Sequence, residues 1–119
     1  MPDWPPSRPQ RKGERMSNFE ITPDGHGFIV SGELDLANAR EFAAAFREAL
    51  PVGGPCTVDM RPLRFMDSSG VHTVVAAAKL APNACIVLHG VHDEVQKVVE
   101  LTGIQALPNL HVIPCTVGI

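Results

Sequence analysis

The chain has 119 residues, of which 45% are hydrophobic and 19% are charged, with a formal net charge of −3. This length and composition predict a single domain with a modest hydrophobic core. Because residues 1–16 hold four basic and two acidic residues, the rest of the chain carries the net negative charge, which argues against binding nucleic-acid phosphates directly as its main role.

The first 16 residues differ in composition from the rest. They contain four prolines, four basic residues and few apolar anchors, which predicts a flexible basic arm (1–16) followed by a folded domain (17–119). The longest apolar runs are far too short to cross a membrane, and the N-terminus does not resemble a signal peptide. We therefore expect a soluble cytoplasmic protein with no membrane association.

Three cysteines and five histidines raise the question of metal binding. Cys56, Cys85 and Cys115 are odd in number and widely spaced, and neither they nor the histidines show metal-ligand spacing. Buried apolar roles in a reducing compartment are the simpler interpretation of the cysteines. We expect no metal site.

The first predicted elements are two strands joined by a hairpin turn and followed by a helix. Phe19–Ile21 and Phe28–Val30 read as strands, and Pro23–Gly25 is a turn signal between them. After Asp35, apolar residues recur at spacings of three and four, which predicts a helix over about 36–50 that Asp35 opens or caps. The proline and glycines that follow end this helix.

Strands alternate with helices in the remainder of the chain. The unbroken apolar run at 85–88 is typical of a strand covered on both faces, and Gly103 suits the end of the last helix. This alternation after a hairpin predicts an α/β fold, with a mixed sheet of four to five strands and three or more helices packed on it. The further predicted elements are strands over 56–60, 85–88 and 110–113 and helices near 68–80 and 92–102.

The most informative segment is Phe65–Gly70, which reads F-M-D-S-S-G between apolar segments. A helix that begins here leaves its first backbone N–H groups without partners and carries positive dipole character. Asp67 or Ser68 is suited to cap that helix. A hydroxyl at this position can be phosphorylated without disrupting the helix, because the added charge lies at the favourable end of the dipole.

Three segments of the chain, in order, match motifs of a known family. Val30–Asp35 ends in G-E-L-D, Thr57–Gly70 joins an apolar strand to D-S-S-G, and Val95–Ile104 ends in E-L-T-G-I. With these motifs the chain resembles the STAS domain family, and in particular its stand-alone bacterial anti-sigma factor antagonists. The resemblance covers roughly residues 19–113 and implies a STAS-like sheet with packed helices.

The resemblance implies a regulatory role rather than an enzymatic one. The unphosphorylated protein would bind an anti-sigma factor with serine kinase activity and release a sigma factor; phosphorylation of Ser68 would abolish binding, and a serine phosphatase would restore it. The kinase supplies the ATP, so the chain itself needs no cofactor. The implied partner-binding surface comprises Asp35, Asp67, Ser68, Ser69 and Gly70, on a monomer or weak dimer.

Other interpretations of the same segment stay open. Ser68 could serve only as a helix cap, or the chain could be a STAS subunit of a sensory or lipid-transport assembly, or a nucleotide- or small-molecule-binding STAS module. A serine hydrolase is disfavoured, because Met66 stands where the G-x-S-x-G elbow needs glycine. Phosphate-binding glycine loops are also missing from the sequence, and no catalytic residue is expected.

Overall fold

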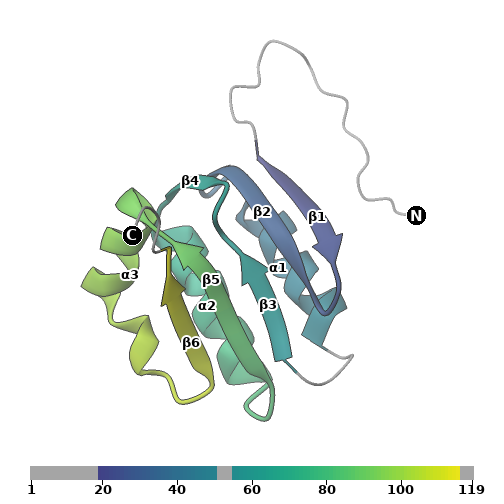
Figure 1. Ribbon diagram of the computed structural model, residues 1–119. Helices are drawn as coiled ribbons and strands as arrows, with labels where there is room; N and C mark the ends of the chain where they lie inside the picture. The colour runs from purple at the N-terminus through teal and green to yellow at the C-terminus, as the bar shows by residue number, and fades with distance from the viewer. Residues whose placement is uncertain (1–18, 51–54, 116–119) are drawn as a thin grey trace.

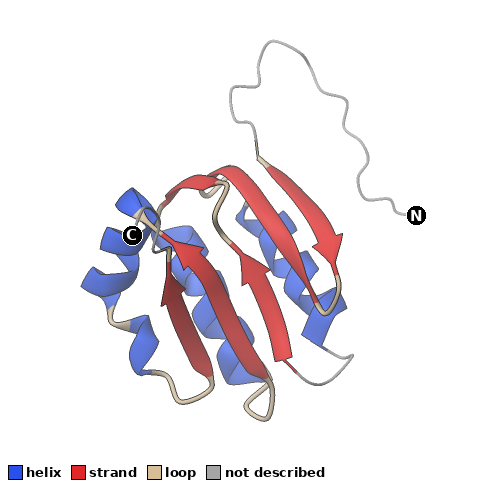
Figure 2. Cartoon of the chain, in the orientation of Figure 1, coloured by secondary structure: helices blue, strands red, loops and turns tan. Residues whose placement is uncertain are grey.

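A mixed β-sheet with α-helices packed behind it forms the body of the computed structural model (Figures 1 and 2). The structure describes residues 19–50 and 55–115, so the predicted arm over 1–16 lies outside the described residues. The strands are β1 (Glu20–Asp24), β2 (Gly27–Leu34), β3 (Pro55–Asp59), β4 (Leu63–Met66), β5 (Cys85–Val91) and β6 (Leu110–Pro114), and the helices are α1 (Ala39–Ala49), α2 (Ser68–Leu80), α3 (Asp93–Thr102) and a short 3-10 turn, Ile104–Ala106.

The sheet begins with the predicted hairpin and continues with parallel strands. Its order is β1-β2-β3-β5-β6, with β1 antiparallel to β2 and each later neighbour parallel. β2 pairs first with β3 at Phe28 and Ile29 and then with β4 from Gly32 to Leu34. A bulge follows Gly32, whose φ of +92° favours glycine. This change of partner brings the carboxyl ends of β2 and β4 side by side.

The core lies between the sheet and the helices, and alternate strand residues enter it. Phe28 on β2 meets Phe42 and Phe46 of α1, with ring centroids 6.0 and 5.2 Å from its own. Over 85–88 only the alternate residues Ile86 and Leu88 are fully buried, whereas Cys85 and Val87 are half-buried. The expectation that 85–88 is covered on both faces is therefore wrong, since no described helix lies in front of the sheet in Figure 1.

Two further details differ from the sequence-based expectations. Within the described residues the sheet has six strands, whereas four to five were expected. The additional strand is the four-residue β4. The helix expected over 36–50 begins only at Ala39, with Asn38 as its N-cap residue. Asp35 is thus not the N-cap, and Leu36, the first residue of the helix expected over 36–50, is 78% exposed in the turn before Ala39. The α/β fold itself, the hairpin and the helix over 68–80 are confirmed.

The cysteines are free thiols in the structure. Cys56 is buried on β3, and this burial raises the pKa of its thiol to about 11, so it remains protonated near neutral pH. Cys85 and Cys115 are half-buried. Across the described ranges no helix is long and apolar enough to span a membrane, and no group of three or more metal-ligating side chains is assembled.

Candidate functional site

Two parallel strand ends and one helix start meet at the same edge of the sheet. Leu34, the last residue of β2, lies opposite Met66, the last residue of β4. The backbone N–H of Asp67 donates to the carbonyl oxygen of Leu34 over 3.1 Å, which extends the pairing one residue further. Asp35 and Asp67 follow these two residues directly, so segments far apart in the sequence place two carboxylate-bearing residues beside each other.

The first turn of α2 is capped by Asp67, as one of the two sequence-based alternatives predicts. Asp67 has extended backbone geometry, and its Oδ1 accepts a hydrogen bond of 2.8 Å from the backbone N–H of Ser69. Its carbonyl oxygen accepts the N–H of Gly70 over 3.1 Å. Ser68 is the first helical residue, and its side chain is exposed. The cap therefore leaves the Ser68 hydroxyl accessible from solvent.

Gly70 allows α2 to begin directly on the two strand ends. A Cβ atom at this position would lie 2.5 Å from Met66 Cγ and 2.7 Å from Leu34 Cδ2, well inside van der Waals contact. Both of these side chains are fully buried, so they have little room to move aside. The glycine of the D-S-S-G sequence is thus required by packing, and it sets how close Ser68 lies to the end of β2.

Asp35 is held in a tight turn by Asn38, a buried polar side chain that is only 7% exposed. Asn38 Oδ1 accepts the backbone N–H of Asp35 over 2.9 Å, and Asn38 Nδ2 donates to the carbonyl oxygen of Glu33, also over 2.9 Å. The Asp35 carboxylate in turn accepts the N–H of Ala37. These bonds fix the chain between β2 and α1 and thereby position Asp35 next to the start of α2.

The two serines of the motif have different environments. Ser68 is exposed, whereas Ser69 is half-buried and its carbonyl oxygen accepts a hydrogen bond of 2.9 Å from Thr73 Oγ1. The first turn of α2 carries no Asp or Glu, so the cap residue Asp67 and the neighbouring Asp35 supply the negative charge described near the positive end of the helix dipole. Of the two hydroxyl-bearing residues, Ser68 is the one that a large partner can reach more readily.

The corner between β3 and β4 is held by a second group of polar side chains. Arg61 makes a two-point ion pair with Asp59, at 3.0 and 2.7 Å, which lowers the pKa of the Asp59 carboxyl group. His92 Nε2 lies 2.8 Å from the carbonyl oxygen of Arg61, and Nδ1 lies 3.1 Å from Asp93 Oδ2. Because both oxygens accept hydrogen bonds, these contacts favour the doubly protonated ring and raise the pKa of His92.

The structure thus brings the sequence-predicted residues together: Asp67, Ser68, Ser69 and Gly70 start α2, and Asp35 lies on the adjacent strand end. Sequence reasoning did not single out Asn38 or the pair of Arg61 and His92. Asn38 had a detectable signal, because asparagine is favoured at helix N-caps and lies three residues after Asp35. The contact between Arg61 and His92 joins distant loops, and no local pattern predicts it.

Comparison with known families identifies the fold. The family model described as "Mlab, STAS domain" matches residues 18–112. The chain belongs to the STAS domain family. In this STAS domain the resemblance seen in the G-E-L-D and D-S-S-G motifs is confirmed, and both motifs lie at the strand ends described above. A sequence comparison with curated proteins found no significant match.

Several solved structures share the fold at low sequence identity. An anti-sigma factor antagonist from Mycobacterium paratuberculosis is 18% identical, with a TM-score of 0.59, over 81% of this chain and 86% of that one. The unphosphorylated anti-sigma factor antagonist SpoIIAA is 22% identical (TM-score 0.55; 79% and 86% covered), and the phosphorylated form of SpoIIAA, a Bacillus cell fate determinant, also matches. The murine anion transporter Slc26a9 is 17% identical (TM-score 0.56), over 76% of this chain and 16% of the transporter.

Proposed function

We propose that the protein is an anti-sigma factor antagonist whose partner binding is switched by phosphorylation of Ser68. The observation that carries this proposal is the exposed Ser68 hydroxyl on the first residue of α2, beside Asp35 and Asp67. In the unphosphorylated state this surface binds an anti-sigma factor that is also a serine kinase, and a sigma factor is released. This binding of the anti-sigma factor and release of the sigma factor take place in the cytoplasm. A serine phosphatase removes the phosphate from Ser68 and restores binding.

Phosphorylation of Ser68 changes charge more than shape. The phosphate adds about −1.5 to −2 charges, and it lies at the N-terminus of α2, where the helix dipole stabilises negative charge. The domain therefore remains folded. When the partner binds, the phosphate must leave water and face a surface that fits a neutral hydroxyl, which is unfavourable. The carboxylates of Asp35 and Asp67 add repulsion toward acidic partner groups. The partner is released while the switch protein stays intact.

Two exposed apolar side chains support a protein partner rather than a small ligand. Leu36, directly after Asp35, is 78% exposed, and Phe65, on β4 two residues before Asp67, is 42% exposed. Phe65 lies opposite Glu33 in the pairing of β4 with β2. Apolar anchors beside polar groups are typical of protein interfaces, where a few buried side chains contribute most of the binding energy.

The solved structures support the same role. They include antagonists of anti-sigma factors, and one of these, SpoIIAA, has been determined with and without phosphate. Their likeness to this chain is one of fold, so the role rests on Ser68 and its surroundings. A second candidate is a STAS domain that works inside a larger assembly, because the transporter Slc26a9 contains the same fold as a small part of its chain. In that case the exposed edge at Ser68 would be a permanent contact.

A capture experiment distinguishes these roles. The wild-type protein and the variants Ser68→Ala, Ser68→Glu and Ser69→Ala are used to capture partners from extracts of the source cells, and captured kinases are tested for phosphate transfer with phosphosite mapping. We expect a kinase-type anti-sigma factor with the wild type, Ser68→Ala and Ser69→Ala, and reduced capture with Ser68→Glu. Phosphate is expected on Ser68 in the wild type and in Ser69→Ala. Recovery of transporter subunits by all four proteins would favour the assembly role instead.

A further inference from the structure

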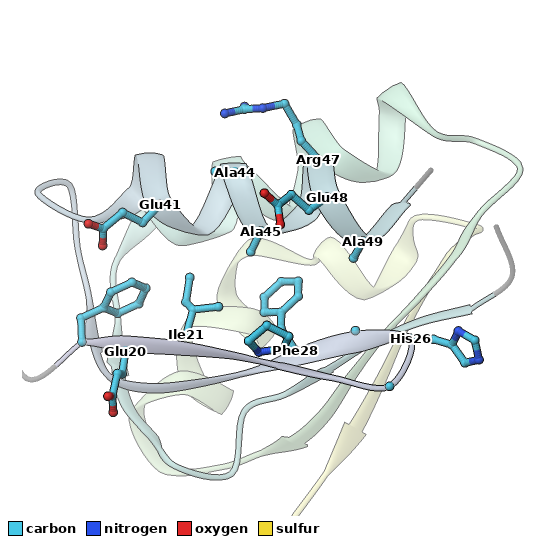
Figure 3. Close-up of a pocket in the computed structure, with 14 residues that line it drawn as sticks. Glu20, Ile21, His26, Phe28, Glu41, Ala44, Ala45, Arg47, Glu48 and Ala49 are labelled. Carbon is cyan, nitrogen blue, oxygen red and sulfur yellow. The ribbon is translucent and has the colours of Figure 1, made fainter. Parts of the chain in front are cut away.

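A groove runs between the N-terminal hairpin and α1, away from the strand ends that carry Ser68. Its volume is about 950 Å³, and Figure 3 shows Ile21 and Phe28 pointing from the hairpin toward the helix above them. The facing positions of α1 are alanines, among them Ala45 and Ala49, whose short side chains do not fill the space. The hairpin and the helix therefore leave an apolar floor open to solvent.

Acidic side chains lie along the helix side of this groove. Glu41 and Glu48 both line it from α1, whereas Arg47, one residue earlier than Glu48, extends away from the cavity in Figure 3. The groove therefore combines an apolar floor with negative charge at its rim. This combination fits an occupant that carries both apolar and basic side chains.

The segment of the chain that precedes β1 has this composition. Phe19 lines the groove itself, and 18 residues come before it in the sequence. They include Trp4, two P-x-x-P repeats, at 2–5 and 6–9, and four basic residues (Arg8, Arg11, Lys12 and Arg15) against two acidic ones. Proline-rich segments with this spacing form extended polyproline helices that bind in grooves with apolar and aromatic floors.

We propose that residues 1–18 bind back into the groove between the hairpin and α1 of the same molecule. The 11 residues of α1 span about 16 Å, and roughly five or six residues of polyproline helix cover that length at about 3.1 Å each. The 18 residues before Phe19 are therefore more than sufficient. The tether at Phe19 holds the segment at an effective concentration in the millimolar range, so weak intrinsic affinity is enough for substantial occupancy.

This inference is independent of the proposed switch at Ser68, and it differs from the expectation of a free arm. The sequence reveals the basic, proline-rich segment but not the groove, because the groove is formed by residues of β1, β2 and α1 that are distant along the chain. Only the folded domain places an acidic rim within reach of the four basic side chains.

Trp4 provides a direct test, because it is the only tryptophan in the chain. Its fluorescence quenching by acrylamide is measured in the full-length protein and in a synthetic peptide of residues 1–18. With a tether in the millimolar range and a dissociation constant of similar size, about half of the molecules hold the segment in the groove. We expect quenching in the full chain about twofold weaker than in the peptide, with emission at shorter wavelength.

Two charge-reversal variants make the test specific to the groove. Glu48→Arg should raise Trp4 quenching toward the peptide value, whereas Glu94→Arg, an exposed position on α3 outside the groove, should leave it unchanged. Equal quenching in the full chain and the peptide would overturn the proposal, as would equal effects of the two variants. Protection that disappears on dilution would also overturn it, because a second copy would then supply the segment.

Discussion

Replacing the buried Asn38 tests whether the turn that carries Asp35 depends on this one side chain. Asn38→Ala removes two hydrogen bonds of 2.9 Å, one from the N–H of Asp35 and one to the carbonyl oxygen of Glu33. Each such bond contributes about 0.5–1.5 kcal/mol net, and more where its partner is left unsatisfied. The free energy of unfolding should therefore fall by about 2 kcal/mol. At roughly 4 °C per kcal/mol for a domain of this size, the melting temperature should fall by about 8 °C.

Urea denaturation and thermal melts of the two proteins measure this loss. Asn83→Ala is the matched control, because Asn83 is exposed between α2 and β5, and it should change stability by less than about 0.5 kcal/mol. Since Asp35 loses its fixed position, Asn38→Ala should also weaken partner binding in conditions where the protein remains folded. A loss of stability no larger than that of the control would refute the role assigned to Asn38.

Two further substitutions test other parts of the same edge. Gly70→Ala places a Cβ atom 2.5 Å from Met66 Cγ. The overpacking cost of about 1–3 kcal/mol should exceed the helix-propensity gain of about 1 kcal/mol, so the variant should be less stable than wild type. A variant more stable than wild type in urea titrations would contradict this. His92 has a raised pKa because it contacts the Arg61 carbonyl group and Asp93, so its contribution to stability is present below about pH 6.5 and is lost as pH rises through the higher folded-state pKa. The stability difference between wild type and His92→Gln should therefore be larger near pH 5.5 than near pH 8.5, and an equal difference at both pH values would show that protonation of His92 is not linked to folding.

The parts of the fold predicted from the sequence are those with a clear local pattern. The helix over 68–80 has both an N-cap residue, Asp67, and regular apolar spacing, and the predicted limits match α2. The hairpin was recognised from its turn residues. β4 was missed because Leu63–Met66 is only four residues long and follows β3 closely. So short a segment shows too little alternation to be separated from a loop.

The position of Asp35 illustrates where sequence reasoning about the site reached its limit. The motif places Asp35 before a helix, and the turn closed by Asn38 differs from a direct N-cap by only a few residues. What distinguishes the two arrangements is the bonding of Asn38 to backbone groups on both sides of Asp35. Both bonds lie within residues 33–38, and the short motif is compatible with either arrangement until the backbone geometry of this turn is known.

The central claim is that the phosphate on Ser68 alone decides whether the partner binds. The most direct measurement compares the dissociation constants of unphosphorylated and homogeneously Ser68-phosphorylated protein for the kinase-type anti-sigma factor recovered by capture, by isothermal titration. Placing an unpaired charge in an interface costs about 2–5 kcal/mol, and each 1.4 kcal/mol is tenfold in affinity. We expect the phosphorylated protein to bind about 30-fold to several thousandfold more weakly while it retains its fold. Equal dissociation constants for the two forms would contradict the account.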